Sequence, residues 1–348
     1  MGVVVNERHR ERGGGGGELD HPVVRAERDT AVPAAQSFWS EAPARDTLEF
    51  VRENAGLRED HPSQRRWSPR SRPYCESTST QSGFAPVQGT ALYYEMAGDG
   101  PPVILMHPGQ AGLVLWERQF LPFARSYRVI RYDARGFGRS ERPDEVFSHY
   151  EDLRGLLDHL GIERASLVGL SLGGRTAIDF ALTHPSNVTS LVLVNVGISG
   201  YKFTGLAEYF KAIKDAADRG DRETFVEVSL RQWFDGPGQP ATRTAPALRE
   251  EVKRLMREHT EQAARRDTRP RVQEVGAVER LGEIAAPTLI VESALDAPDA
   301  HAISALLERS IRGSRRVVIE DAAHLVNVER PDEFARVVLD FLNAVRDT

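Results

Sequence analysis

The stretch "LVGLSLGGRTAIDFAL", residues 167–182, moves from an apolar run through glycines and one serine into a helical pattern. The apolar run predicts a buried strand, and the residues from Arg175 onward predict a helix. Gly169, Ser171 and Gly173 match the G-x-S-x-G pattern in the strand-to-helix context that the pattern requires. The two glycines are expected because side chains there would collide with neighbouring backbone. We therefore predict that Ser171 is a nucleophile held on a sharp turn, with a plain tight turn as the alternative.

Strand and helix patterns alternate from about Phe84 to the end of the chain, with one interruption. Short runs that predict strands occur at 91–98, 101–107, 127–133, 165–170, 188–195, 286–293 and 315–320. Residues 199–285 interrupt this alternation with helical patterns alone. These patterns lie at 206–219, 222–233 and 246–266. We predict an α/β fold, with a mostly parallel twisted sheet, helices on both faces and a helical insertion that packs over the sheet as a cap.

Residues 1–82 differ in composition from the rest of the chain. They contain the glycine run Gly13–Gly17, and their apolar residues are too sparse and irregular to build a core that offsets the entropy of ordering. Only residues 46–57 show a short helical pattern. We expect a mostly disordered extension, and a misassigned start of translation is the alternative. The predicted domains that follow are a first part of the core at 83–198, the cap at 199–285 and a second part of the core at 286–348.

Composition argues against several classes of protein. A formal net charge of -6 over 348 residues provides no basic surface for nucleic acid. No segment approaches the roughly 18 apolar residues that span a bilayer, and the first residues lack the pattern of a secretory signal. The single cysteine, Cys75, forms no internal disulfide, which fits a reducing compartment. We expect a cytoplasmic protein with neither nucleic acid nor membrane as a partner, and the sequence predicts no particular oligomeric state.

Four motifs, in order along the chain, resemble those of the α/β-hydrolase family with a helical cap. They are "HPGQ" at 107–110, "DARGFGRS" at 133–140, "GLSLGG" at 169–174 and "DAAHLVNVERPDEF" at 321–334. The resemblance extends from about residue 84 to residue 348, which is about three quarters of the chain. Within the family, the chain resembles in particular the branch of enol-lactone hydrolases and small-molecule esterases. The resemblance implies a nucleophile, a general base and an orienting acid in the chain order Ser, Asp, His.

His324 is the candidate general base, with a structural loop histidine as the alternative. It follows the predicted strand 315–320 and precedes the last helix, so its imidazole can reach back over the strand ends. Two carboxylates, Asp296 and Asp299, follow the strand 286–293. The resemblance places the acid a few residues beyond that strand and favours Asp296, which would accept a hydrogen bond from His324 and fix its tautomer. Asp299 stands just before a helix and suits the role of its N-cap equally well.

The resemblance also implies an oxyanion hole built from backbone N–H groups. Leu172, which follows the nucleophile, and Gln110 are the expected donors, with Gly109 as the alternative to Gln110. This chain departs from the commoner family pattern because Pro108 has no N–H to donate. His107 ends the preceding strand. We favour a loop-fixing role for it over that of a second base, and we also name it as a candidate for lining the substrate pocket.

For several other residues we expect a structural role, or leave a structural and a functional role open. Trp233, in a predicted cap helix, either lines the substrate pocket or packs the cap on the sheet. Asp133 and Arg135 are expected to fix their turn rather than to act in catalysis. The glycines of "RGFGRS" do not complete G-x-G-x-x-G and open no helix, so a phosphate site is not expected there. No cysteine or histidine cluster has metal-ligand spacing, and we expect neither a cofactor nor a metal.

The predicted triad implies acyl transfer to water through a covalent ester on Ser171. A serine at this turn argues against the family's dehalogenases and epoxide hydrolases, which use an aspartate there. We expect a hydrolase of a small-molecule carboxylic ester or lactone. The alternatives with the same triad are a carbon–carbon bond hydrolase and a cofactor-free perhydrolase of the haloperoxidase type. From another class, the alternative is a non-catalytic ligand-binding receptor.

Overall fold

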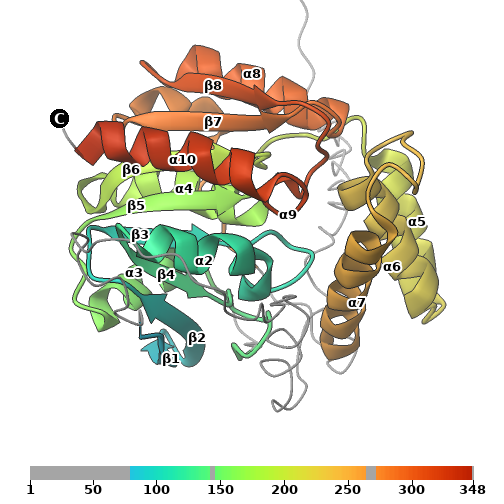
Figure 1. Cartoon of the computed structure of the whole chain (residues 1–348), viewed down its shortest axis with the longest axis horizontal. Coiled ribbons are helices and arrows are strands. Elements are labelled where there is room, and N and C mark those ends of the chain that lie inside the picture. Colours follow the sequence, from blue (N-terminus) through green and yellow to red (C-terminus); the bar gives the residue numbers. More distant parts are fainter. Residues whose placement is uncertain (1–78, 142–145, 264–271, 347–348) are drawn as a thin grey trace, which may run out of the picture. The chain divides into compact units, whose positions relative to one another are not determined.

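The computed structural model describes residues 79–141, 146–263 and 272–346, and its core is an eight-stranded sheet in the order β1-β2-β4-β3-β5-β6-β7-β8 (Figure 1). The strands are β1 (Gln81–Val87), β2 (Thr90–Ala97), β3 (Pro102–Met106), β4 (Arg128–Tyr132), β5 (Ala165–Leu170), β6 (Val188–Val194), β7 (Thr288–Ser293) and β8 (Arg315–Ile319). Strand β2 is antiparallel to both of its neighbours, and the remaining pairs of neighbours are parallel. The predicted mostly parallel sheet is confirmed.

Helices cover both faces of the sheet. They are α2 (Glu117–Ala124), α3 (His149–His159), α4 (Leu172–Thr183), α8 (Pro298–Ser310), α9 (Val326–Glu329) and α10 (Pro331–Arg346). Successive residues of a strand point to opposite faces, so Val103 and Leu105 of β3 belong to one hydrophobic cluster and Ile104 and Met106 to the other. The first cluster includes side chains of α2 and α10, which lie in front of the sheet in Figure 1, and the second includes side chains of α3, α4 and α8.

The parallel register brings the carboxyl ends of the central strands to one edge of the sheet. Leu170 at the end of β5 pairs with Val194 at the end of β6, and Val194 pairs in turn with Val291 of β7. Met106 at the end of β3 pairs with Gly169. The loops that follow these strands therefore meet at this edge, which is where ligand sites of α/β sheets form.

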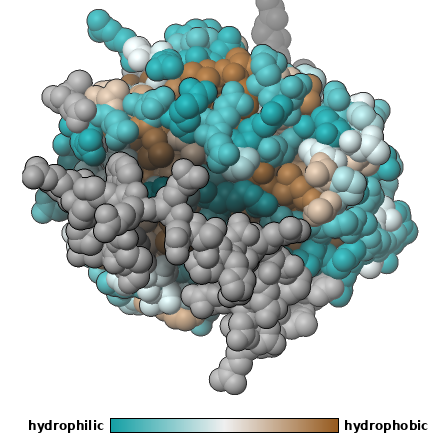
Figure 2. Space-filling model, in the orientation of Figure 1, coloured by the Kyte–Doolittle hydropathy of each residue, from teal (hydrophilic) through white to brown (hydrophobic). Residues whose placement is uncertain are grey.

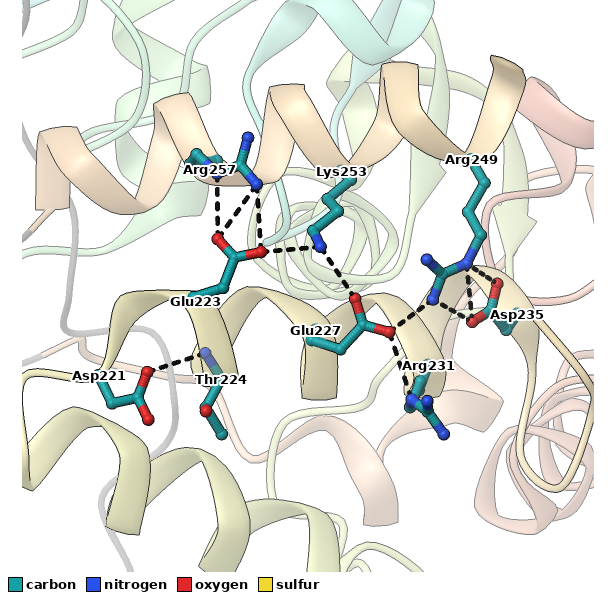
Figure 3. A network of polar contacts seen from close by, with 9 residues as sticks. All are labelled: Asp221, Glu223, Thr224, Glu227, Arg231, Asp235, Arg249, Lys253 and Arg257. Carbon is teal, nitrogen blue, oxygen red and sulfur yellow. Dashed lines mark hydrogen bonds and ion pairs between the residues drawn. The ribbon is translucent and has the colours of Figure 1, made fainter. Parts of the chain in front are cut away.

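Between β6 and β7 the chain forms a helical insertion. Its helices are α5 (Ala207–Asp218), α6 (Arg222–Leu230) and α7 (Pro246–Ala263). A turn of π-helix at Arg231–Asp235 extends α6 and ends at Gly236, whose φ is +95°. Ion pairs join α6 to α7, since Glu227 contacts both Arg249 and Lys253 (Figure 3). The insertion is thus a connected unit of helices, as its sequence patterns predict.

The core begins earlier than the sequence predicts. Strand β1 starts at Gln81, which pairs with Met96, so Gln81 and Ser82 belong to the sheet rather than to an extension that ends at residue 82. Both side chains are polar and exposed, and they therefore carry no hydrophobic signal. Residues 1–78, with Cys75 and the expected helix at 46–57, lie outside the described residues. In the part of the chain that is described, no helix combines the length and apolar character needed to cross a membrane.

Candidate active site

The turn between β5 and α4 holds Ser171 in a strained backbone conformation. Its φ is +54° and its ψ is -109°, and its N–H donates a 2.9 Å hydrogen bond to the carbonyl of Val194. A residue with a side chain rarely adopts a positive φ, and such strain concentrates at functional turns. A Cβ on Gly169 would lie 2.5 Å from the backbone of Gly173, and a Cβ on Gly173 would lie 2.2 Å from the carbonyl oxygen of Met106. The steric reason for the two glycines is confirmed.

The loops after β7 and β8 bring Asp296 and His324 together. The Nδ1 of His324 lies 2.7 Å from Oδ2 of Asp296, and the two side chains are 4% and 0% exposed. The other carboxylate oxygen accepts a 2.7 Å hydrogen bond from the N–H of Ala297. Because an ionised carboxylate only accepts hydrogen bonds, Nδ1 carries the imidazole proton and Nε2 keeps its lone pair.

The free nitrogen of His324 belongs to the cavity that Ser171 also lines. This cavity has a volume of about 170 Å³. The Nε2 of His324 is buried and has no hydrogen-bond partner among the described residues. A buried acceptor without a partner is unfavourable, and in native proteins it requires a functional explanation. The imidazole of His324 and the side chain of Ser171 thus border the same space.

Asp299 is engaged elsewhere. Its Oδ1 accepts hydrogen bonds from the N–H and the hydroxyl of Thr204, at 3.1 and 3.2 Å, and its Oδ2 accepts one from the N–H of Gly205 at 2.7 Å. Helix α8 is capped by Ala297, because Pro298 takes the first helical position. Asp299 is therefore neither the partner of His324 nor the N-cap. Its hydrogen bonds connect the start of the insertion, at Thr204 and Gly205, to α8.

The expected oxyanion donors lie around the same cavity. Leu172 is the first residue of α4 and lines the cavity together with Gly109 and Gln110. A Cβ on Gly109 would meet nothing within 4 Å, so the loop leaves open space there. The side-chain oxygen of Gln110 is buried without a hydrogen-bond partner among the described residues. The assignment of the Leu172 and Gln110 N–H groups to an oxyanion hole stays a prediction.

Two backbone groups near the end of β3 and β4 contact the ring of His107. Its Nε2 accepts a 2.9 Å hydrogen bond from the N–H of Ala134, and its Nδ1 lies 2.7 Å from the carbonyl oxygen of Pro108. The described residues that line the cavity do not include His107, so its place in the substrate pocket stays a prediction without support from the cavity lining. Burial lowers the pKa of His107 to about 4, so the ring is neutral with its proton on Nδ1. The contacts agree with the loop-fixing role.

Trp233, in the π-helical turn of the insertion, lies against the ring of His324. The two ring centroids are 4.5 Å apart, and the ring planes meet at 47°. The indole N–H of Trp233 donates a 2.7 Å hydrogen bond to the hydroxyl of Tyr209 on α5. Both aromatic side chains line the cavity. The insertion therefore contributes directly to the cavity wall beside His324.

Sequence reasoning missed Asn195, which follows β6 with a φ of +44°. Its Nδ2 donates to the carbonyl of His324 at 3.0 Å and to the hydroxyl of Ser293 at 2.7 Å, and its Oδ1 accepts from the N–H of Ser293. One amide side chain thus joins the end of β7 to the loop that carries His324. The available signal was an asparagine directly after an apolar strand, because asparagine tolerates a positive φ better than most residues.

Glu329 was also missed. Its Oε1 accepts a 3.0 Å hydrogen bond from the N–H of Ala323, the residue before His324. Burial raises the pKa of Glu329 to about 7 despite the nearby guanidinium of Arg243. Glutamate at the end of a short helix is common, and nothing in the sequence marks this one.

The "DARGFGRS" segment is a structural turn, as expected. Asp133 accepts hydrogen bonds from the N–H groups of Leu113 at 2.8 Å and Arg139 at 3.0 Å, and burial raises its pKa to about 6. Arg135 donates from Nε to the Oδ2 of Asp152 at 2.7 Å.

Among the described residues, no group of three or more histidine, cysteine, aspartate or glutamate side chains is arranged to hold a metal ion.

A family profile described as the alpha/beta hydrolase fold matches residues 101–331. The chain belongs to the alpha/beta hydrolase family and is an enzyme of the hydrolase class.

Individual relatives cover most of the chain. A 2-hydroxy-6-oxo-6-phenylhexa-2,4-dienoate hydrolase from Comamonas testosteroni is 31% identical over 72% of this chain and 91% of its own length. A 3-oxoadipate enol-lactonase from Acinetobacter baylyi is 24% identical over 74% of this chain and 96% of its own. Among solved structures, Est816, described as an N-acyl homoserine lactone degrading enzyme, superposes with a TM-score of 0.61 at 30% identity, covering 74% of this chain and all of its own.

Proposed function

We propose that this hydrolase cleaves a small-molecule carboxylic ester or lactone through an acyl-enzyme on Ser171. The observation that carries the proposal is the contact between His324 and Asp296, which leaves the Nε2 of His324 without a partner in the cavity that Ser171 lines. An acid that orients a base, and a base that borders a nucleophile, are the parts of a serine hydrolase triad.

In the first half-reaction, Nε2 of His324 takes the hydroxyl proton of Ser171 while Oγ attacks the carbonyl carbon. Asp296 stabilises the imidazolium that forms. The N–H groups of Leu172 and Gln110 donate to the oxyanion, each contributing about 3 kcal/mol to the transition state. The tetrahedral intermediate then breaks its bond to the leaving oxygen, which receives the proton from Nε2, and the acyl group stays on Ser171.

In the second half-reaction, water takes the place of the leaving alcohol. Nε2 of His324 accepts one proton from this water while its oxygen attacks the acyl carbon. The ester bond to Ser171 breaks, Oγ recovers a proton from the imidazolium, and the carboxylic acid is released. For a lactone, the alcohol and the acid leave as one molecule.

The helical insertion is the cap of this site. Trp233 and Tyr209 border the cavity beside His324, so the insertion shapes the space that a substrate fills. Two of the relatives, the 3-oxoadipate enol-lactonase and the N-acyl homoserine lactone degrading enzyme, are named for lactone substrates. Their similarity supports a lactone or a related ester for this chain.

Hydrolysis of a carbon–carbon bond is the second candidate. The relative from Comamonas testosteroni is named for a 6-oxo-6-phenyl dienoate, which contains a ketone and no ester. The same serine, histidine and aspartate can attack a ketone carbonyl, with a carbon atom as the leaving group.

A substrate panel tests the proposal. Wild-type protein is assayed with p-nitrophenyl esters, aliphatic lactones and a vinylogous 1,5-diketone, beside Ser171→Ala and the matched control Ser186→Ala on an exposed turn. We expect ester or lactone turnover that Ser171→Ala abolishes and Ser186→Ala retains. Turnover of the diketone alone would replace ester hydrolysis by carbon–carbon cleavage, and ester turnover that survives Ser171→Ala would contradict the mechanism.

A further inference from the structure

The cavity wall is largely apolar beyond the reacting groups. Its side chains include Phe203, Leu206, Phe210, Phe225, Met256 and Ile303. By contrast, the face of the molecule shown in Figure 2 is mostly hydrophilic, with separate smaller apolar areas. A concave apolar site favours an apolar ligand group, because burial of apolar surface is favourable and burial of an unpaired charge is not.

Arg175 is the only arginine or lysine among the described residues that line the cavity. It lies on α4, one turn after Ser171, and its side chain is 15% exposed. Its Nη1 is 2.6 Å from Oε1 of Glu274, and its Nη2 is buried with no hydrogen-bond partner among the described residues. Glu274 therefore compensates the positive charge of Arg175 on the side of Nη1.

Asp299 adds a negative charge to the same wall. Its carboxylate is buried and held by the backbone N–H groups of Thr204 and Gly205. Neutral N–H groups stabilise this charge without cancelling it. An acyl group that ends in a carboxylate would meet Asp299. Arg175, the one cation among the described residues that line the cavity, is already paired with Glu274, which lies outside that lining.

We propose that the cavity takes an uncharged, apolar acyl group and rejects acyl groups that end in a carboxylate, and that Glu274 enforces this choice by holding Arg175. The proposal rests on the ester or lactone hydrolysis proposed above. It assigns Glu274 a role in specificity, since without its charge the guanidinium of Arg175 becomes available to pair with an anionic substrate.

Methyl esters test this acyl specificity. Their alcohol part is only a methyl group, so the acyl group determines how well the substrate fits the cavity. Methyl hexanoate and monomethyl adipate are compared by pH-stat titration. We expect kcat/KM to be at least roughly 100-fold higher for the hexanoate, since burying an unpaired carboxylate is strongly unfavourable. Values within about threefold of each other, or a preference for the adipate, would overturn the proposal.

Glu274→Gln tests the role of the ion pair. The amide keeps a hydrogen-bond acceptor for Arg175 but loses the charge, and we expect the adipate-to-hexanoate ratio of kcat/KM to rise roughly tenfold, or about 1.4 kcal/mol. Adding Arg175→Met should return the ratio to its wild-type value. The matched control is Glu283→Gln, which alters the Arg280–Glu283 pair outside the cavity and should leave the ratio unchanged. An unchanged ratio in folded Glu274→Gln protein would overturn the role of Glu274.

A binding measurement separates this proposal from the proposed function. Ser171→Ala protein is titrated calorimetrically with hexanamide and with adipamate, which differ in the terminal carboxylate. Tighter binding of hexanamide, by at least roughly tenfold, is expected. If neither methyl ester is hydrolysed but hexanamide is preferred, ester hydrolysis fails and the specificity stands. Tighter binding of adipamate would overturn the proposed acyl specificity, whether or not the protein hydrolyses esters. Both titrations use Ser171→Ala protein, so neither depends on the stability of a Glu274 variant.

Discussion

Arg243 of the helical insertion forms a 2.6 Å ion pair with Glu329, at the foot of the loop that carries His324. The two side chains are 13% and 2% exposed. Arg243 also donates hydrogen bonds to the carbonyls of Phe234 at 2.6 Å and Asp321 at 3.1 Å. Trp233 precedes Phe234, so one guanidinium joins the turn that packs on the imidazole to the loop that holds it. The insertion and the loop of His324 are thus held together by one side chain.

Arg243→Met tests this coupling. The substitution keeps much of the side-chain volume but leaves Glu329 buried without its cation, and we expect the free energy of unfolding to fall by about 3 kcal/mol. We also expect kcat to fall by at least about tenfold, because a displaced imidazole misaligns proton transfer. Urea denaturation and steady-state kinetics measure the two effects.

The matched control is Arg154→Met, which breaks an exposed Arg154–Asp158 pair on α3. Exposed pairs contribute little, so its free energy of unfolding should change by less than about 1 kcal/mol and kcat should not change. If Arg243→Met behaves like Arg154→Met, the ion pair has no positioning role.

Gly173→Ala tests the packing of the serine turn. The new Cβ would lie 2.2 Å from the carbonyl oxygen of Met106, so the turn or β3 must move. We expect a loss of about 3 kcal/mol in unfolding free energy and at least about a 100-fold loss of kcat/KM. Gly109→Ala, where the Cβ meets nothing within 4 Å, should change stability by less than about 0.5 kcal/mol. Equal stability losses in the two variants would contradict the steric argument.

His107 predicts a specific pH dependence of stability. Burial lowers its pKa from 6.5 to about 4, so between these values the unfolded chain binds a proton that the folded protein does not. This histidine therefore destabilises the fold as the pH decreases from 6.5 towards 4. Buried carboxyl groups with raised pKa values, such as Asp133, act in the opposite direction, and a variant at His107 isolates its own contribution.

His107→Gln should reduce the slope of unfolding free energy against pH by roughly 1 kcal/mol per pH unit between pH 4.5 and 6. Chemical denaturation of wild type and variant across this range measures the difference. Parallel curves would show that the ring carries the same proton in the folded and unfolded states.

Local constraints made the sharp turn at Ser171 predictable from sequence. A buried strand, a helix pattern and two glycines around Ser171 restrict the backbone within a few residues, and the structure shows the clash that each glycine avoids. Alternation of strands and helices likewise predicted the parallel sheet. The exposed start of β1 at Gln81 has no apolar pattern and could not be placed.

Long-range contacts account for what the sequence did not reveal. Asp296 and Asp299 are three residues apart, and the choice between them depended on family resemblance until the contacts of each were known. The orientation of His107 is set by Ala134, on a different strand's loop. Arg243 and Asn195 reach partners far away in the chain, and no local pattern predicts which partner an exposed-looking polar residue will meet.

Labelling with a fluorophosphonate tests the central claim most directly, because the reagent reacts far faster with an activated serine hydroxyl than with an ordinary one. Intact-protein and peptide mass spectrometry should find one adduct per chain, on Ser171. His324→Gln should abolish this adduct in folded protein, since no base then removes the proton, and Asp296→Asn should slow it. A wild-type protein that is not labelled, or a Ser171 adduct that forms at the same rate without the imidazole of His324, would contradict the account.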